Sequence, residues 1–270
     1  MRDELIERGF VRVPGVLTAD EVAAYRQVTD RLLEEHAAMQ EAFKAQGSMI
    51  PATKDPSFAD LVTHPRALAA FRALGYDAPT FTDGYVISKP GGGKPLFWHY
   101  DWFAWDDPVS HEDEPQQLFA MYYLTDTTRE NGCLRVVPGS HRRHNPLHDL
   151  LLEPHSAKLT GAEDMDDSAF STRPDEEDVP IAAGDLLIGD ARLLHAAHAN
   201  RTDQRRTLIT LWYQPDFARL PERIQAQLMR HVRRPGDWWP EDKREKLGAM
   251  FPAYAGTAEP YPRTLYRRAA

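Results

Sequence analysis

Residues 97–104 read FWHYDWFA, and this short stretch indicates both the fold and the chemistry. Its aromatic residues are typical of a half-buried β-strand. Because successive side chains of an extended strand alternate between faces, His99 and Asp101 should point the same way, with Tyr100 on the other side. An imidazole and a carboxylate on one face are two of the three protein ligands that a non-haem Fe(II) site requires.

A second histidine lies far downstream, in a region of short strands. Residues 186–188 (LLI) and 207–213 (TLITLWY) read as strands, His195 ends the apolar run between them, and residues 200–204 read as a turn. A ligand so distant in sequence must be brought in by the fold, which favours a sheet rolled on itself over a local metal finger. Arg206, eleven positions after His195, could then fold back toward the metal.

Two histidines and one carboxylate leave the other positions of the metal open for a chelating co-substrate and O₂. The triplet alone is weak evidence, because a second His-x-Asp occurs at residues 111–113. That copy lies in the acidic stretch 110–115 (SHEDEP) and is predicted to be solvated surface. His198 competes for the role of downstream ligand, and we interpret it as a neighbour of the site or as a loop histidine.

Four segments together carry a more specific resemblance. Residues 9–17 (GFVRVPGVL) precede a helical pattern, the His-x-Asp triplet follows, residues 131–141 read NGCLRVVPGSH, and the downstream histidine and arginine come last. In this order they resemble the phytanoyl-CoA dioxygenase family of Fe(II)/2-oxoglutarate oxygenases, whose signature NGxLxxxPGSH is similar to the third segment. The resemblance extends from residue 9 to about residue 216.

The resemblance implies a role for each matching residue. His99, Asp101 and His195 would bind the catalytic iron. Arg206 would bind the distal carboxylate of 2-oxoglutarate, a task that suits a planar, permanently charged guanidinium able to form two hydrogen bonds. Lys89 resembles a family lysine that helps to hold the co-substrate, with a solvated lysine as the alternative. The implied cofactor is Fe(II), and 2-oxoglutarate and O₂ are the implied co-substrates.

Two positions near the downstream histidine leave alternatives open. Arg205 adjoins Arg206, and strand alternation should turn it to the opposite face. Ala196 and Ala197 occupy the place where the family has a small hydroxyl residue. One hydrogen bond to the co-substrate must therefore come from another residue or from water.

The expected fold is mainly β with flanking helices, built on a double-stranded β-helix (a jelly-roll, cupin-like core). Helical patterning dominates residues 1–75, whose helices should pack on one outer face, and short strands dominate the core at about 80–216. Residues 147–180 read as an insertion, and its acidic stretches at residues 163–167 and 175–178 are predicted to form an exposed or mobile lid segment. A C-terminal helix and tail occupy residues 217–270, and the whole of 1–270 is interpreted as one domain.

Composition agrees with a soluble, cytoplasmic enzyme. The 270 residues are 42% hydrophobic, which is enough for one sizeable core. A net charge of −9 argues against nucleic acid or an anionic membrane as a partner. The one cysteine, Cys133, cannot form an intramolecular disulfide and fits a reducing cytoplasm. The acidic N-terminus is unlike a signal peptide, and no apolar run reaches membrane-spanning length.

The primary substrate is the least defined part of the prediction. Trp98, Trp102 and Trp105 surround the iron-binding strand, and they could line a pocket for an apolar or ring-shaped molecule or fill the core. The family acts on acyl thioesters, small osmolytes and secondary metabolites, and this acidic chain has few basic clusters for a CoA ester. We predict oxidation of a C–H bond of a small-molecule metabolite, with release of succinate and CO₂. A cupin-like metal hydrolase or isomerase without 2-oxoglutarate and a metal-free binding module are the alternatives, and the oligomeric state is left open.

Overall fold

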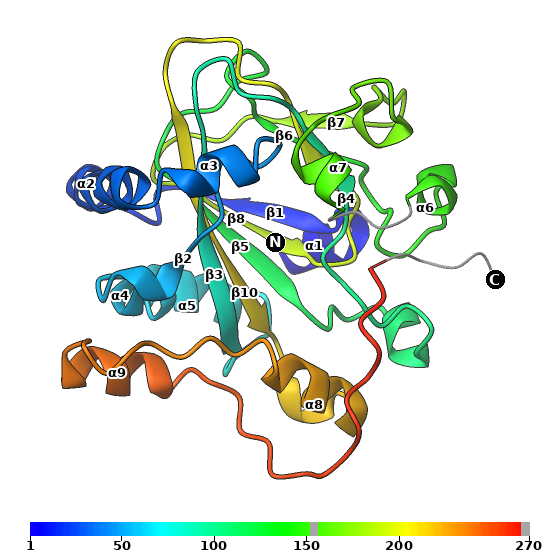
Figure 1. The fold of residues 1–270 in the computed structure, drawn as a ribbon. Helices are drawn as coiled ribbons and strands as arrows, with labels where there is room; N and C mark the ends of the chain where they lie inside the picture. The colour runs from blue at the N-terminus through cyan, green and yellow to red at the C-terminus, as the bar shows by residue number, and fades with distance from the viewer. Residues whose placement is uncertain (152–155, 266–270) are drawn as a thin grey trace.

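Two antiparallel sheets form the centre of the molecule (Figure 1). The computed structural model describes residues 1–151 and 156–265. The major sheet has the strand order β1-β8-β5-β10-β3-β2, and the minor sheet has the order β4-β9-β6-β7. The major sheet consists of β1 (Phe10–Val13), β2 (Ile50–Pro51), β3 (Thr80–Lys89), β5 (Leu118–Tyr123), β8 (Leu186–Asp190) and β10 (Arg206–Gln214). The minor sheet consists of β4 (Leu96–His99), β6 (Leu134–Val136), β7 (Glu177–Val179) and β9 (His195–Ala197).

The register of two strand pairs brings the predicted site residues together. In the major sheet, Arg206 at the start of β10 pairs with Lys89 at the end of β3. In the minor sheet, His99 at the end of β4 pairs with His195 at the start of β9. The two sheets form the jelly-roll core that the sequence predicts, without closing into a barrel.

Helices flank the sheets, and the longest of them begins at a clear sequence signal. Glu21 donates its backbone N–H to the Thr18 hydroxyl, and the Glu21 carboxylate accepts from the backbone N–H of Thr18, which together form a capping box. The α-helices are α1 (Arg2–Arg8), α2 (Ala19–Glu35), α3 (Ala38–Ala42), α4 (Phe58–Val62), α5 (Pro65–Ala73), α6 (Pro146–Leu150), α7 (Ala157–Thr160), α8 (Glu222–Met229) and α9 (Glu241–Gly248). Short 3₁₀ helices occupy Ala52–Lys54, Pro108–His111, Ser168–Phe170 and Phe217–Arg219. Within the part of the chain that the structure describes, no helix combines the length and apolar character needed to cross a bilayer.

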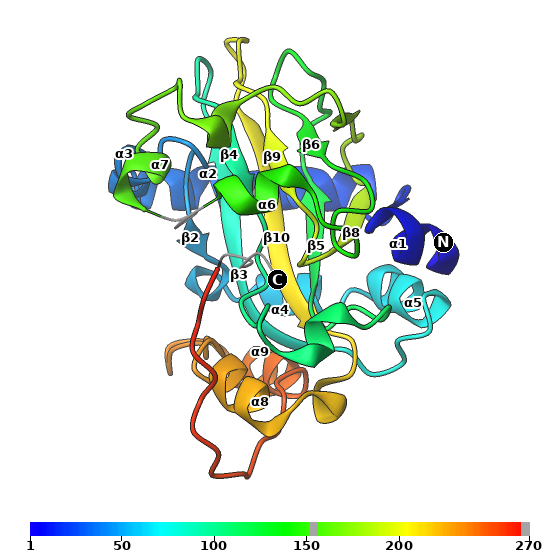
Figure 2. The same cartoon turned by 90° about the vertical axis from the view of Figure 1, so that its right-hand side faces the viewer.

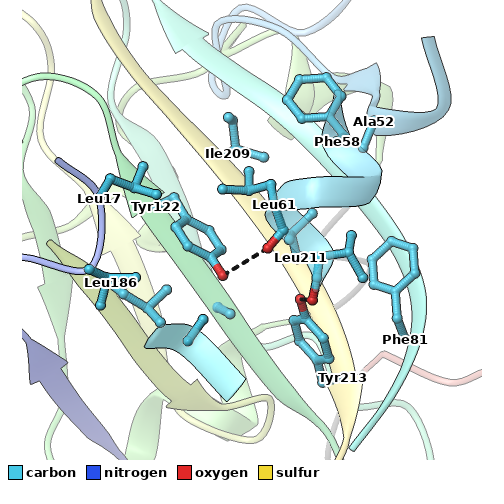
Figure 3. Packing of buried hydrophobic residues seen from close by; sticks show 14 of the residues in the cluster. Leu17, Ala52, Phe58, Leu61, Phe81, Tyr122, Leu186, Ile209, Leu211 and Tyr213 are labelled. Atoms are coloured by element: carbon cyan, nitrogen blue, oxygen red, sulfur yellow. Dashed lines mark hydrogen bonds between the residues drawn. The ribbon is translucent and has the colours of Figure 1, made fainter. Parts of the chain in front are cut away.

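The outer face of the major sheet is covered by α2, α4, α5 and α9 (Figure 1). Phe58 and Leu61 of α4 pack in one layer with Leu211 and Tyr213 of β10 (Figure 3). The buried hydroxyl of Tyr122 donates to the backbone oxygen of Leu61 at 3.2 Å, so the layer leaves this polar group paired. The helices from the N-terminal region therefore pack on one outer face as predicted, and α9 from the C-terminal segment joins them.

Apolar side chains also fill the space between the two sheets. Phe119 and Met121 of β5 and Leu187 of β8 pack against Leu134 and Val136 of β6. Side chains on one face of a strand recur at every second residue, so this inner layer uses the strand faces that point away from the helices. The layer is incomplete near one end, where a cavity remains between the sheets.

The outer side of the minor sheet carries an aromatic layer that includes Trp98. Leu147 of α6 and Leu159 of α7 are buried in this layer, and Figure 2 shows α6 in front of β4 and β9. The acidic stretches 163–167 and 175–178, predicted to be exposed or mobile, are not buried, whereas the apolar residues of the insertion cover aromatic surface that would otherwise face water. Residues 152–155 of the insertion lie outside the described residues.

Candidate metal and co-substrate site

The two predicted histidine ligands face each other across neighbouring strands, with ring centroids 4.1 Å apart. His99 Nδ1 lies 3.0 Å from the backbone oxygen of Phe97, and His195 Nδ1 lies 2.9 Å from that of Leu193. A carbonyl oxygen only accepts hydrogen bonds, so each Nδ1 carries the proton and each lone pair is on Nε2. Both rings are thereby held in the tautomer that binds a metal through Nε2.

Asp101 lies just past the end of β4 rather than within it. The predicted strand over residues 97–104 stops at His99, and the backbone N–H groups of Asp101 and Trp102 both donate to the Ala191 oxygen, at 2.8 and 3.0 Å. Even so, Asp101 Oδ1 is 3.8 Å from His99 Nε2. The turn after β4, rather than alternation along a strand, thus places the Asp101 carboxylate beside the histidines.

The other oxygen of Asp101 is held by a residue that the sequence argument missed. Trp212 of β10 donates its indole Nε1–H to Asp101 Oδ2 at 2.9 Å. This bond leaves Oδ1 turned toward the histidine pair, as a hydrogen bond to a metal-binding carboxylate should. Since Arg206 and Trp212 share one face of β10 by alternation, the even-numbered positions of that strand were a signal that could have identified the tryptophan.

The three side chains fit a metal ion in number, type and position. The ligand atoms of His99, Asp101 and His195 all lie within 4.8 Å of one another, and the two histidines are buried. An ion with bonds of about 2.1 Å to nitrogen and oxygen would draw them slightly closer. Two imidazoles and one carboxylate on one side of an ion match the facial arrangement of non-haem Fe(II) oxygenases.

A cavity extends from this triad to a pair of buried cations. Lys89 and Arg206 line its far end and are 0% and 3% exposed. The Lys89 ammonium donates to the backbone oxygens of Ala45, at 3.0 Å, and of Lys94, so the solvated alternative for this lysine is wrong. Burial, together with the nearby Arg206 charge, lowers the pKa of Lys89 well below its ordinary value.

Arg206 differs from Lys89 because its buried guanidinium lacks the hydrogen-bond partners that the Lys89 ammonium has. Among the described residues no carboxylate forms an ion pair with Arg206, and its Nε has no hydrogen-bond partner. Arg205 faces the opposite side of β10, as predicted, where it donates to the Ser88 backbone oxygen at 3.3 Å and to Gln40 Oε1 at 2.8 Å. A buried, unpaired guanidinium is costly, so the cavity is suited to an anion.

Other buried polar atoms without partners converge on the same cavity. The side-chain amide of Gln46 and the hydroxyl of Thr210 have no hydrogen-bond partner among the described residues, and both line the cavity with Arg206. Buried polar groups are normally paired, so their convergence indicates a polar ligand. Thr210 is therefore a candidate for the hydroxyl contact that Ala196 and Ala197 cannot supply.

Two other predictions are resolved by side-chain direction. His198 points away from the triad and its Nε2 lies 2.5 Å from Asp178 Oδ1 on β7, so it does not join the metal ligands. The second His-x-Asp, at residues 111–113, is exposed as predicted. Strand alternation explains the first result, because His195 and His198 have opposite parity and lie on opposite sides of β9 and its extension.

The three tryptophans proposed to contact the substrate are packed elsewhere. Trp98, Trp102 and Trp105 are buried in the aromatic layer outside the minor sheet. They line neither the cavity between the triad and Arg206 nor the wider cleft that adjoins it. Trp98 donates to the Ser171 backbone oxygen at 2.9 Å and Trp102 to the Ser110 hydroxyl at 2.7 Å. Burial makes all three core residues, the alternative left open by the sequence, and the two hydrogen bonds fix Trp98 and Trp102 in place.

A second, wider cleft adjoins the metal end of the cavity. Its volume is about 520 Å³, and it shares Met49, Asp101 and Trp212 with the inner cavity. Phe103 and Tyr85 add aromatic surface to its walls. Clefts of a few hundred cubic ångströms suit small organic molecules. The inner cavity and this outer cleft therefore meet at Asp101.

The contact between Trp212 and Asp101 can be tested by removing one hydrogen bond. Trp212→Phe should weaken Fe(II) binding by about 10–100-fold, because it releases a carboxylate that the indole orients. Anaerobic metal titration measures the change. Trp239→Phe is the matched control, because Trp239 likewise donates its indole N–H, in this case to the backbone oxygen of Thr53 at 3.1 Å, away from the site. Equal metal affinity in Trp212→Phe and wild type would contradict the role given to this contact.

Comparison with known proteins agrees with this geometry. The model of the family described as Phytanoyl-CoA dioxygenase (PhyH) matches residues 5–208. A phytanoyl-CoA dioxygenase domain-containing protein 1 homolog of Caenorhabditis briggsae is 26% identical over 58% of this chain, which spans only about half (54%) of that relative. An ectoine dioxygenase of Stutzerimonas stutzeri is 26% identical over 76% of this chain and 74% of its own length.

A solved structure extends the comparison to bound groups. The epimerase SnoN in complex with Fe³⁺, alpha ketoglutarate and nogalamycin RO is 27% identical, with a TM-score of 0.58 over 79% of this chain and 81% of its own. The jelly-roll core and the match to most of the sequence lead to the same assignment. This chain belongs to the phytanoyl-CoA dioxygenase family.

Proposed function

We propose that this protein is an Fe(II)- and 2-oxoglutarate-dependent dioxygenase that oxidises a C–H bond of a small-molecule metabolite and releases succinate and CO₂. One observation carries the proposal. A two-histidine, one-carboxylate triad and an unpaired, buried arginine line the same cavity, at opposite ends. Hydrolysis at a metal does not require the second feature, whereas binding a 2-oxo dicarboxylic acid uses both.

Each lining group has a task in this proposal. His99, Asp101 and His195 hold the metal, which when bound supplies the site where the 2-oxo acid chelates and O₂ is reduced. Arg206 forms two charge-assisted hydrogen bonds to the distal carboxylate, and these fix the position of the co-substrate along the cavity. Thr210 supplies a further hydrogen bond along the same path.

The cavity walls also exclude water from the reacting atoms. Met121, Leu134 and Leu208 line the space between the triad and the arginine. Electrostatic contacts are stronger in such a dry environment, so the Arg206 contact contributes more here than it would at the surface. In a hydroxylation, one oxygen atom of O₂ enters succinate, the other enters the substrate, and the carboxyl group next to the keto carbon of 2-oxoglutarate leaves as CO₂.

Proteins similar to this chain catalyse different reactions. SnoN is described as an alpha ketoglutarate dependent epimerase, and the Stutzerimonas stutzeri relative is an ectoine dioxygenase. Related sites thus serve different outcomes, and our proposal is hydroxylation or another oxidation at a C–H bond. The outer cleft of about 520 Å³ supports a small metabolite as the substrate.

The proposal can be tested without knowing the primary substrate. Anaerobic addition of Fe(II) and 2-oxoglutarate to the full chain should produce a weak visible charge-transfer band, because the keto and carboxylate oxygens chelate the metal together. Glutarate is the matched control, since it keeps both carboxylates but lacks the keto oxygen, and it should give no band. A protein that binds Fe(II) but gives the same spectrum with both acids would instead support a hydrolase or isomerase that does not use 2-oxoglutarate.

A further inference from the structure

The outer cleft has a wall that the family match does not include. The match ends at residue 208, whereas His231, Arg233 and Arg263 line the cleft from the C-terminal segment. Figure 1 shows that segment, in red, running past α8 toward the loop that follows β4. These residues therefore add basic side chains to the cleft from a part of the chain that lies outside the family match.

The position of Arg263 is set by contacts on both sides of it. Tyr261 donates its backbone N–H to the Arg223 oxygen on α8 at 2.8 Å, and Thr264 donates to the Phe103 oxygen at 3.3 Å. Thr264 also forms a parallel bridge with Ala104. The tail is thus docked beside the segment that follows Asp101. Arg263 lies between these anchors and lines the cleft with Phe103.

The charges that line the cleft do not cancel. Arg233 forms two hydrogen bonds to the Asp83 carboxylate, at 2.9 and 3.2 Å, and is thereby neutralised. Asp101 is committed to the metal. Arg263 has no ion pair with any carboxylate in the described part of the chain; burial lowers its pKa, and the nearby Asp101 carboxylate only partly offsets this. One positive charge is left over.

His231 does not change this balance at neutral pH. Burial lowers its pKa, and so do the neighbouring charges of Arg263, Arg233 and Arg230. Its Nε2 lies 3.1 Å from the Gln227 side-chain nitrogen, which donates to it, as expected for a neutral ring. The excess charge of the cleft therefore resides on Arg263.

We infer that the primary substrate carries one carboxylate, which Arg263 binds, and an apolar body that lies between Phe103, Trp212 and Met49. This inference rests on the proposed function, because it assumes that the substrate's oxidised carbon faces the metal end of the cleft. A guanidinium matches a planar carboxylate with two hydrogen bonds. A phosphate dianion would need more positive charge than one unpaired arginine offers.

The overall charge of the protein makes the local excess meaningful. With a net charge of −9, the chain repels anions in general, so it would take up a carboxylic acid only where a local cation offsets that repulsion. Arg263 lies in the cleft lining with the aromatic side chain of Phe103 and is close enough to Asp101 to interact with it electrostatically. It is a specificity-determining residue in this inference and is not needed to bind iron or 2-oxoglutarate.

Three probes of similar size test the inference. 3-Phenylpropanoate, 3-phenylpropanamide and 3-phenylpropylamine carry an anionic, a neutral and a cationic group on one apolar body. Their dissociation constants are measured by ligand-observed NMR titration against the full chain, anaerobically with Fe(II) and saturating 2-oxoglutarate, so that the co-substrate cavity is filled. We expect the carboxylate to bind at least about tenfold more tightly than the amide, and the amine to bind most weakly.

Substitutions assign the preference to one arginine. Arg263→Gln should remove the preference by weakening only the carboxylate, and Arg263→Lys should retain part of it. Arg230→Gln is the matched control, because it removes the same charge from α8's end without lining the cleft, and it should keep the full preference. The dissociation constant of 2-oxoglutarate should be unchanged in all three variants.

Every other result overturns the inference. Equal binding of the carboxylate and the amide, or no binding of the carboxylate, excludes a carboxylate subsite. A preference that survives in Arg263→Gln but disappears in Arg206→Ala belongs to the co-substrate cavity. The titration is repeated with Fe(II) but without 2-oxoglutarate, so that Asp101 stays bound to the metal, and a preference that depends on Arg263 then stands even if the charge-transfer band of the proposed function is absent.

Discussion

Asp101→Ala is expected to lower the Fe(II) affinity of this protein by more than about a hundredfold and to remove nearly all conversion of 2-oxoglutarate to succinate. Losing an outer contact to a metal ligand already costs about 10–100-fold in affinity, and here a ligand itself is lost. The remaining imidazoles of His99 and His195 would hold the ion without the one negative charge that the triad contributes. Anaerobic metal titration and a succinate assay measure the two effects.

The structure offers a matched control for the metal prediction. His198→Ala removes an imidazole three positions after His195, but its side chain pairs with Asp178 and not with the triad. Iron binding should therefore be kept in His198→Ala and lost in His195→Ala. Wild-type turnover in either His99→Ala or His195→Ala would disprove the ligand assignment.

The second large effect concerns the co-substrate. Arg206→Ala should raise the dissociation constant of 2-oxoglutarate about thirtyfold or more while Fe(II) binding is largely kept. Removing one partner of a buried, hydrogen-bonded charge pair costs roughly 2–5 kcal/mol, and the lower figure already corresponds to about thirtyfold. The distal carboxylate would be left with Lys89, whose ammonium is already bound to two backbone oxygens. Titration of the charge-transfer band with 2-oxoglutarate measures the effect.

Arg205→Ala is the control for this prediction. Arg205 is next to Arg206 but donates to Ser88 and Gln40 on the other side of β10. Its loss should leave 2-oxoglutarate binding near the wild-type value. If Arg205→Ala weakens binding and Arg206→Ala does not, the strand register is misassigned by one residue, and if neither matters, the cavity does not bind 2-oxoglutarate.

Local periodicity accounts for the predictions that the structure bears out. Alternation along residues 206–212 is enough to place Arg206 and Arg205 on opposite faces, because the backbone of a strand imposes it wherever the strand lies. The same holds for the separation of His195 from His198. The helix that follows Thr18 begins at a capping box, another signal contained within a few residues. Such features depend on near neighbours in sequence, so sequence alone is sufficient.

Contacts between distant segments account for what the sequence could not determine. The aromatic residues around β4 look alike in sequence, yet Trp98 and Trp102 are buried outside the minor sheet, whereas Trp212 reaches Asp101. The sequence leaves open whether Lys89 is solvated or buried. Its pairing opposite Arg206 and its hydrogen bonds to the backbone oxygens of Ala45 and Lys94 show that it is buried. Each outcome depends on which loops and strands pack together.

What the sequence determines and what only the tertiary structure decides therefore differ for a physical reason. The sequence by itself indicated the jelly-roll class, the three residues His99, Asp101 and His195 that meet at one site, and the inward arginine, because short motifs, their order along the chain and strand alternation can all be read from it. The tertiary structure alone decided that Trp212 orients Asp101, that Gln46 and Thr210 join the cavity, and that Arg263 reaches the outer cleft. These neighbours come from segments far apart in the chain, and their meeting is set by sheet register and the packing of buried side chains, which no local pattern records.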